Sequence, residues 1–162
     1  MSSSFGDIVA EETLFFMCDM QVKFVPVMQH FDDIITVTER LIEGGQILKI
    51  PLIVTEQYPK GLGNTIPQLN IKHASVFPKN KFTMFIPEVE EIIVWKNPKH
   101  VVLFGIEAHI CILQTVIDLL KHNIQVHVVA DACTSRNLMD RLFAFEVFIY
   151  YIYFILMDLF LI

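Results

Sequence analysis

The chain has 162 residues, enough for one domain with a buried core, and 54% of them are hydrophobic. Its 12 basic and 18 acidic residues give a formal charge of −6, which argues against a nucleic-acid partner because nucleic-acid binding surfaces are basic. Three cysteines without metal-like pairing, and no signal-like segment before the first apolar run, predict a cytoplasmic protein, with a mitochondrial or peroxisomal address left open.

Short apolar runs alternate with longer segments of helical period, which is typical of an α/β protein with a largely parallel sheet. We predict strands near residues 13–18, 51–55, 74–77, 101–105 and 125–130, and helices near 32–47, 86–94, 109–121 and 135–146. Residues 1–12 are expected to form a flexible N-terminus. The segment 56–73, rich in Gly, Pro and Asn, is predicted to be a long loop, and such loops are often functional.

The segment from Gly105 to Cys111 carries the clearest chemical signal. An apolar run ends at Gly105, and Cys111 falls in the first turn of the next predicted helix. Backbone N–H groups and the helix dipole favour a thiolate there, which makes Cys111 a candidate nucleophile. Asp19 follows the first predicted strand, at the end of the sheet where open α/β folds bind ligands. Taken alone, however, Cys111 could equally be a packed core residue, and Asp19 a helix cap or loop residue.

Several segments, spread along the chain, resemble one known family. They are Cys-Asp-Met-Gln at 18–21, Lys-Asn-Lys-Phe-Thr-Met-Phe at 79–85, the 105–111 segment, and Val-His-Val-Val-Ala-Asp-Ala-Cys at 126–133. Together they resemble the isochorismatase-like cysteine hydrolases, and most closely the isochorismatase domain-containing proteins of eukaryotes. Thr-Glu-Gln-Tyr-Pro-Lys-Gly-Leu-Gly at 55–63 is characteristic of that branch. The resemblance runs from about residue 13 to about residue 144.

The resemblance implies a three-layer α/β/α, Rossmann-like fold and a catalytic triad of Asp19, Lys79 and Cys111. In that family the aspartate is the general base, the cysteine the nucleophile and the lysine the charge that favours the thiolate. Lys79 is preferred over Lys81 because it fits the family pattern Lys-x-x-aromatic-Ser/Thr-x-Phe. No glycine-rich dinucleotide fingerprint is present, so we expect no nucleotide or other cofactor.

The family also places a cis peptide after the glycine, here between Ile106 and Glu107, which turns backbone N–H groups toward a substrate oxygen. We expect the substrate and oxyanion pocket to contain Ile106, Glu107, Ile110, Gln57, Tyr58 and Phe24. No metal is expected, because related nicotinamidases hold zinc with Asp-x-His where this chain has Glu-Gln-Tyr at 56–58. Cys18 and Cys133 are expected to be buried and inert.

The last residues, 145–162, are apolar on all sides. The 16 residues from Val147 onward fall short of the roughly 20 that a spanning helix needs, so we expect no membrane partner. Relatives continue here with a polar helix, a strand and a closing helix. We therefore expect a domain over 13–144 that lacks its final strand and helix, and a non-family tail over 145–162 from truncation or aberrant splicing. A tail anchor and a genuine core element are the alternatives.

These features predict a cysteine-dependent hydrolase of a small amide or related small molecule, working through a covalent intermediate. The alternative is a catalytically silent binding or scaffold protein of the same fold. The resemblance also implies a homo-oligomer.

Overall fold

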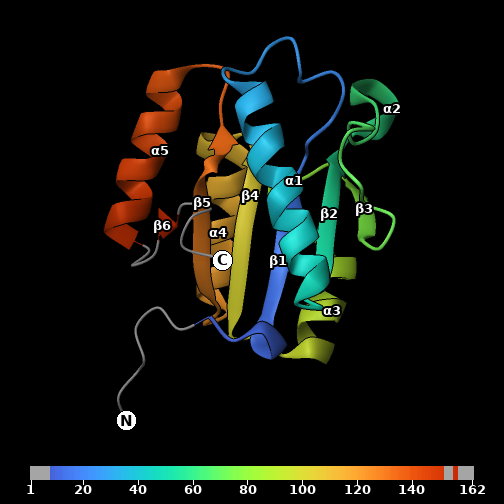
Figure 1. Cartoon of the computed structure of the whole chain (residues 1–162). Coiled ribbons are helices and arrows are strands. Elements are labelled where there is room, and N and C mark those ends of the chain that lie inside the picture. Colours follow the sequence, from blue (N-terminus) through green and yellow to red (C-terminus); the bar gives the residue numbers. More distant parts are fainter. Residues whose placement is uncertain (1–7, 152–154, 157–162) are drawn as a thin grey trace.

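A parallel β-sheet forms the centre of the molecule, in a computed structural model that describes residues 8–151 and 155–156 (Figure 1). The strand order is β3-β2-β1-β4-β5-β6, and every neighbouring pair is parallel. The strands are β1 (Thr13–Cys18), β2 (Leu52–Gln57), β3 (Ser75–Lys79), β4 (His100–Ile106), β5 (Gln125–Thr134) and β6 (Ile155–Leu156). The predicted α/β class with a parallel sheet is confirmed.

Helices cover both faces of this sheet, which gives the expected three layers. They are α1 (Phe31–Ile47), α2 (Pro59–Leu62), α3 (Pro87–Lys96), α4 (Leu113–Lys121) and α5 (Leu138–Tyr151), with a 3-10 turn η1 (Ala10–Glu12) and a π-helical turn η2 (Ala108–Ile112). Helix α1 lies on one face, and α3 and α4 lie on the other (Figure 1). Successive strands move one way across the sheet from β1 to β3 and the other way from β4 to β6. Because crossovers between parallel strands are right-handed, this reversal puts α1 on the opposite face from α3 and α4.

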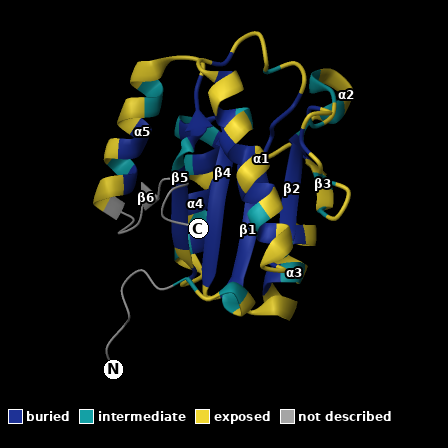
Figure 2. Cartoon of the chain, viewed as in Figure 1, coloured by how far each residue is buried: buried dark blue, intermediate teal, exposed yellow. Residues whose placement is uncertain are grey.

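The central strands are buried along their whole length (Figure 2). Because helices cover both faces, β1 and β4 read as continuous apolar runs and not as alternating ones. The rings of Phe15 on β1 and Phe104 on β4 meet edge to face, with centroids 6.0 Å apart. From α1, an apolar stripe that includes Ile34, Val37 and Leu41 is buried in the core.

Gly105 fixes how closely β1 and β4 meet at their carboxyl ends. It pairs with Cys18 and has a φ of +117°. A Cβ atom at this position would lie 2.2 Å from the carbonyl oxygen of Cys18. Only glycine allows this approach and this backbone angle together. Strands β1 and β4 therefore pack closely at the switch point between them, which is where open α/β folds bind ligands.

The C-terminal third differs from the predicted elements. Strand β5 continues to Thr134, beyond the predicted 125–130, because its pairing resumes after a register shift between Leu103 and Gly105. Helix α5 consequently starts at Leu138, where Asn137 Oδ1 accepts a hydrogen bond from the Met139 backbone, and not at 135. The predicted helix 109–121 begins with the π-helical turn instead of an α-helical one.

The final strand was expected to be missing, and the described residues include a two-residue strand, β6, within the segment expected to be a non-family tail. It pairs with Val128 and Val129 of β5. Helix α5 crosses the expected domain boundary at 144, with Ala144, Phe145 and Phe148 buried. The rest of the expected tail, 152–154 and 157–162, lies outside the described residues, as do residues 1–7 of the expected flexible N-terminus. Within the described part of the chain, no helix combines the length and apolarity needed to cross a membrane.

Candidate active site

Asp19, Lys79 and Cys111 meet at the carboxyl end of the sheet. Asp19 directly follows β1, Lys79 ends β3, and Cys111 lies in the π-helical turn after β4. Lys79 Nζ lies 2.6 Å from Asp19 Oδ2 and 3.7 Å from Cys111 Sγ. All three residues are buried, and Cys111 retains 8% of its surface exposed to solvent. The sequence-predicted triad residues are therefore neighbours in space, contributed by three different parts of the chain.

Lys79 is held in one position by several acceptors at once. Besides Asp19 and Cys111, its ammonium donates to Gln57 Oε1 at 2.6 Å and to the carbonyl oxygens of Phe82 and Lys81 at 3.0 and 3.1 Å. An ammonium has three hydrogens, so these acceptors compete for them. Lys79 therefore acts as a fixed positive charge at the centre of the site.

Asp19 has a left-handed backbone with φ of +53°, which turns its side chain off the end of β1. Its Oδ1 accepts a hydrogen bond of 2.8 Å from the Thr55 hydroxyl on β2, while Oδ2 faces Lys79. Burial raises the pKa of the Asp19 carboxyl, although Lys79 and Thr55 oppose this rise. A carboxylate with a raised pKa is a better proton acceptor, as a general base requires.

The pKa of the Lys79 ammonium is raised as well. Burial lowers it, but the negative charges that Cys18, Asp19 and Cys111 can carry outweigh burial. Lys79 therefore stays protonated and supplies charge, not a proton acceptor.

The turn that carries Cys111 is anchored at both ends. The carbonyl oxygen of Glu107 accepts hydrogen bonds from the backbone of Ile110 and Ile112. The peptide between Ile106 and Glu107 is cis, as the resemblance implied. The Thr115 hydroxyl donates to the Cys111 carbonyl at 2.7 Å. These contacts fix the position of the thiol relative to β4.

The six expected pocket residues lie in three groups. Gln57 and Tyr58 lie at the end of β2, Ile106, Glu107 and Ile110 at the end of β4, and Phe24 in the loop after β1. Ile106 is fully buried, and Ile110 and Phe24 are partly buried against the core.

The Glu107 carboxylate pairs with Arg136, in the loop before α5. Arg136 Nη2 and Nε donate to Glu107 Oε1 at 2.8 and 3.1 Å, and the Arg136 backbone donates to Oε2. Burial alone would raise the pKa of Glu107, but these Arg136 contacts outweigh it and lower the pKa. The backbone carbonyl of Glu107 contacts the turn that carries Cys111, because it accepts the hydrogen bonds from Ile110 and Ile112.

Gln57 takes its position from Gln21. The Gln21 side chain is fully buried, accepts from the Gln57 backbone N–H at 2.7 Å and donates to the Gln57 carbonyl at 3.0 Å. The Gln57 amide is then oriented with its nitrogen toward the Asn80 carbonyl and its oxygen toward Lys79.

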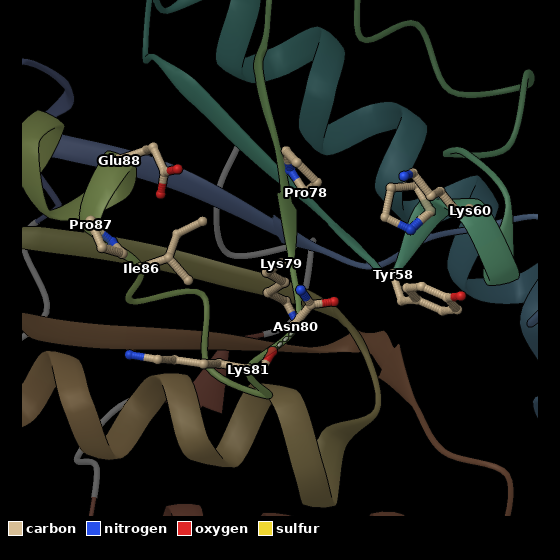
Figure 3. Close-up of a pocket in the computed structure, with 10 residues that line it drawn as sticks. Tyr58, Lys60, Pro78, Lys79, Asn80, Lys81, Ile86, Pro87 and Glu88 are labelled. Atoms are coloured by element: carbon tan, nitrogen blue, oxygen red, sulfur yellow. Dashed lines mark hydrogen bonds between the residues drawn. The ribbon is translucent and has the colours of Figure 1, made fainter.

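A pocket of about 410 Å³ opens on the Lys79 side of the site (Figure 3). Lys79 lies near its centre, between Tyr58 and Lys60 on one side and Pro87 at the start of α3 on the other. Asp19 and Cys111 do not line it, so this pocket reaches the cation and not the thiol.

Cys18, Asp19 and Cys111 each place one potential metal-ligand atom within 4.8 Å of the others. Lys79 lies against two of these three residues, and a buried ammonium opposes a second cation at the same point. The residues present therefore fit the chemistry of a charged triad better than that of a metal centre.

Sequence reasoning missed three residues that build the site. Thr55 supports Asp19, Gln21 orients Gln57, and Cys18, expected only to be a buried strand residue, lies beside Cys111. Gln21 belongs to the same Cys-Asp-Met-Gln segment as Asp19, and this was the available signal. Cys18 and Cys133 are both buried, as expected.

The Isochorismatase domain family model matches residues 13–153 of the chain, past residue 144, where the resemblance was expected to end. This chain belongs to the isochorismatase family. It is 50% identical over 143 residues to isochorismatase domain-containing protein 1 of Salmo salar, covering 87% of this chain and 50% of that protein. It is 40% identical over 141 residues to isochorismatase domain-containing protein 2 of Homo sapiens, covering 87% and 69%. The chain thus spans about half the length of the relatives named isochorismatase domain-containing protein 1.

Solved structures agree with this family. The MAR1 ribonuclease of Caenorhabditis elegans superposes with a TM-score of 0.88 at 45% identity, covering 93% of this chain and 79% of that one. YcaC from Escherichia coli, described as an octameric hydrolase of unknown specificity, superposes with a TM-score of 0.87 at 16% identity, which shows the shared fold. The isochorismatase-like superfamily consists generally of hydrolases.

Proposed function

We propose that this chain is a cysteine hydrolase of a small amide or related small molecule. The observation that supports this most is the buried contact of Lys79 with both Asp19 and Cys111. A thiol is a weak nucleophile until it loses its proton, and this arrangement supplies both a proton acceptor and a compensating positive charge.

In the first step, Asp19 takes the proton of the Cys111 thiol, and the thiolate attacks the carbonyl carbon of the substrate. The C–N bond then breaks, and the leaving amine takes the proton from Asp19. A thioester joins the acyl group to Cys111. Asp19 next removes a proton from a water molecule that attacks the thioester, and the returning thiolate regains this proton.

Lys79 stays protonated throughout and stabilises the thiolate in the first and last steps. The oxyanion of each tetrahedral intermediate would be met by backbone N–H groups of the bend after Gly105 and of Cys111. The pocket that reaches Lys79 is lined by Lys60 and Lys81 as well as by Glu88, which suits an uncharged or weakly anionic substrate.

A second candidate is a silent binding or scaffold protein of the same fold. The low exposure of Cys111 favours it, because a nucleophile must be reached by its substrate. The name of the C. elegans relative adds a further substrate class, RNA, to be tested beside small amides. The charge of −6 weighs against RNA.

The test is turnover of a panel of primary amides, esters and a short single-stranded RNA, with intact-mass detection of an acyl group on the chain. Cys111→Ala should abolish both turnover and adduct, and Cys133→Ala, another buried cysteine outside the site, should retain both. Turnover that survives Cys111→Ala would contradict the covalent mechanism. A compound of the panel that binds the natural chain and Cys111→Ala, and that neither of them turns over, would support the silent alternative.

Homo-oligomerisation is part of this proposal. Exposed apolar side chains on α3 and α5, among them Trp95, Phe143 and Ile149, offer surfaces that a second copy could cover. Light scattering coupled to size-exclusion chromatography would measure the mass in solution, and a monomer at all concentrations would contradict it.

A further inference from the structure

Cys18 is a buried thiol that the hydrolytic mechanism does not use. It ends β1, is completely buried, and accepts a long hydrogen bond of 3.9 Å from the Thr55 hydroxyl. Its sulfur lies within 4.8 Å of the Cys111 sulfur. Burial, its hydrogen bond with Cys111 and the charge of Asp19 all raise the pKa of Cys18, so alone it is an unreactive thiol.

The two thiols differ in access from solvent. Cys111 keeps 8% of its surface exposed, whereas Cys18 has none. A small oxidant such as hydrogen peroxide therefore meets Cys111 first. Lys79 favours the thiolate of Cys111, and the thiolate is the form that peroxide oxidises.

We propose that Cys18 is a resolving cysteine, which forms a disulfide with Cys111 when peroxide oxidises the nucleophile. The proposal rests on the same reactive Cys111 as the proposed hydrolase, but it concerns a different reaction. It also assigns a chemical role to the cysteine in the Cys-Asp-Met-Gln segment.

The reaction balances with one equivalent of peroxide. The Cys111 thiolate attacks one peroxide oxygen, the O–O bond breaks, and a sulfenic acid forms; the released hydroxide and the proton held by Asp19 give water. Cys18 then transfers its proton to Asp19 and attacks the Cys111 sulfur. The S–O bond breaks, and the leaving hydroxide takes the proton to give a second water. Both sulfurs are oxidised by one electron each, and the peroxide is reduced.

The surroundings of Cys18 favour this second step. Oxidation of Cys111 removes a neighbouring negative charge, while Lys79 still lowers the pKa of Cys18. Asp19, adjacent in sequence, can accept the Cys18 proton. A disulfide at this position would protect Cys111 from irreversible oxidation and would block hydrolysis until a thiol reductant restored it.

Peptide mapping of the whole reduced chain after treatment with a few equivalents of hydrogen peroxide tests the proposal. After quenching with N-ethylmaleimide, we expect a linked pair of peptides containing Cys18 and Cys111, which dithiothreitol separates. In Cys18→Ala the linked pair should disappear, and dimedone should capture a sulfenic acid on Cys111. Cys133→Ala is the control and should keep the link.

Two results would overturn the proposal, and neither depends on folding of a variant. One is sulfenic or sulfinic acid on Cys111 of the natural chain with no link to Cys18. This result would contradict the disulfide but not the proposed hydrolase, because it would still show a reactive Cys111. The other is an unmodified Cys111 in excess peroxide; if iodoacetamide also fails to label Cys111, the proposed hydrolase fails too.

Discussion

Gln57 Oε1 accepts a hydrogen bond of 2.6 Å from Lys79 Nζ, as short as the ion pair between Lys79 and Asp19. Gln57 is one of the residues expected in the substrate pocket, and its amide oxygen is directed at Lys79. The neutral amide adds no charge of its own beside Lys79. We infer that Gln57 positions Lys79.

Gln57→Glu should make Cys111 less reactive, because a carboxylate beside Lys79 would compete with the Cys111 sulfur for the positive charge of the ammonium. We expect iodoacetamide labelling of Cys111 at pH 7 to slow by about tenfold, while the melting temperature changes little. Gln57→Leu, which adds no charge, should slow labelling less. An unchanged labelling rate in Gln57→Glu would mean that Gln57 does not influence Lys79 and Cys111.

Arg136→Leu should destabilise the chain by leaving the buried Glu107 carboxylate without its partner. The Glu107 side chain is 6% exposed and that of Arg136 is 60% exposed, so solvent screens part of the pair. We expect a loss of about 1–2 kcal/mol in urea unfolding at pH 7. Lys121→Leu, which removes the exposed pair with Asp118, is the matched control and should cost less than about 0.5 kcal/mol.

The Arg136 effect should also depend on pH. The folded-state pKa of Glu107 is lowered, so its pairing stabilises the fold above the unfolded pKa of about 4.5 and is lost as pH falls below it. The difference between natural chain and Arg136→Leu should therefore shrink toward pH 3. A difference that stays constant with pH would assign the loss to packing of the arginine stem.

A buried histidine pair at the opposite end of the sheet should make the fold sensitive to acid. His100 Nδ1 and His127 Nε2 lie 3.1 Å apart, on β4 and β5. Burial lowers the pKa of both, and that of His127 falls to about 4. A lowered histidine pKa gives stability that is complete above the unfolded pKa and declines as pH falls toward the folded one. Glu12 and Lys99, which face His100, act on its pKa in opposite directions.

Unfolding free energy should therefore fall by about 2 kcal/mol between pH 7 and pH 5 from His127 alone. His127→Gln should flatten this part of the profile, measured by urea titration at closely spaced pH values. A profile that is equally steep in the variant would show that other groups cause the acid sensitivity.

Gly105→Ala should prevent normal folding of the site. The added Cβ would lie 2.2 Å from the Cys18 carbonyl, and the φ of +117° is unfavourable for alanine. We expect a loss of more than about 3 kcal/mol or no folded protein, measured by denaturant unfolding. Gly44→Ala is the control, because no atom lies within 4 Å of its added Cβ, and it should stabilise α1 by about 0.5–1 kcal/mol. Equal behaviour of the two variants would contradict the close approach of β1 and β4.

The sequence was sufficient for elements whose pattern is local. The runs at 13–18 and 101–105 are buried on both faces, so their apolar character alone located β1 and β4 within a residue or two. The π-helical turn at Ala108–Ile112 could not be predicted, because an α-helical turn would present the same apolar residues. The extension of β5 to Thr134 likewise depends on pairing with Gly105 and Ile106, far away in the chain.

The proximity of Asp19, Lys79 and Cys111 was predictable because each lies in a recognisable segment. The residues that hold these side chains in position were not predictable from the sequence. Thr55 and Gln21 contact residues 36 positions away, and although Gln21 lies in the same segment as Asp19, a local sequence does not show which distant residue a side chain contacts. The proximity of Cys18 to Cys111 depends on the bend after Gly105, which the sequence shows only as a glycine.

Three neighbouring strands end with a backbone turned into the left-handed or glycine-specific region, at Asp19 after β1, Tyr58 after β2 and Gly105 near the end of β4. These positions at the strand endings set the backbone around Asp19 and Gly105. Residues 62–66 of the loop after β2 hydrogen-bond to residues 20–23, directly after Asp19, and so belong to the same frame. Exposed residues of the 58–73 loop outside these contacts can vary without moving Asp19, so relatives can change the surroundings of this point of the sheet while keeping it in place.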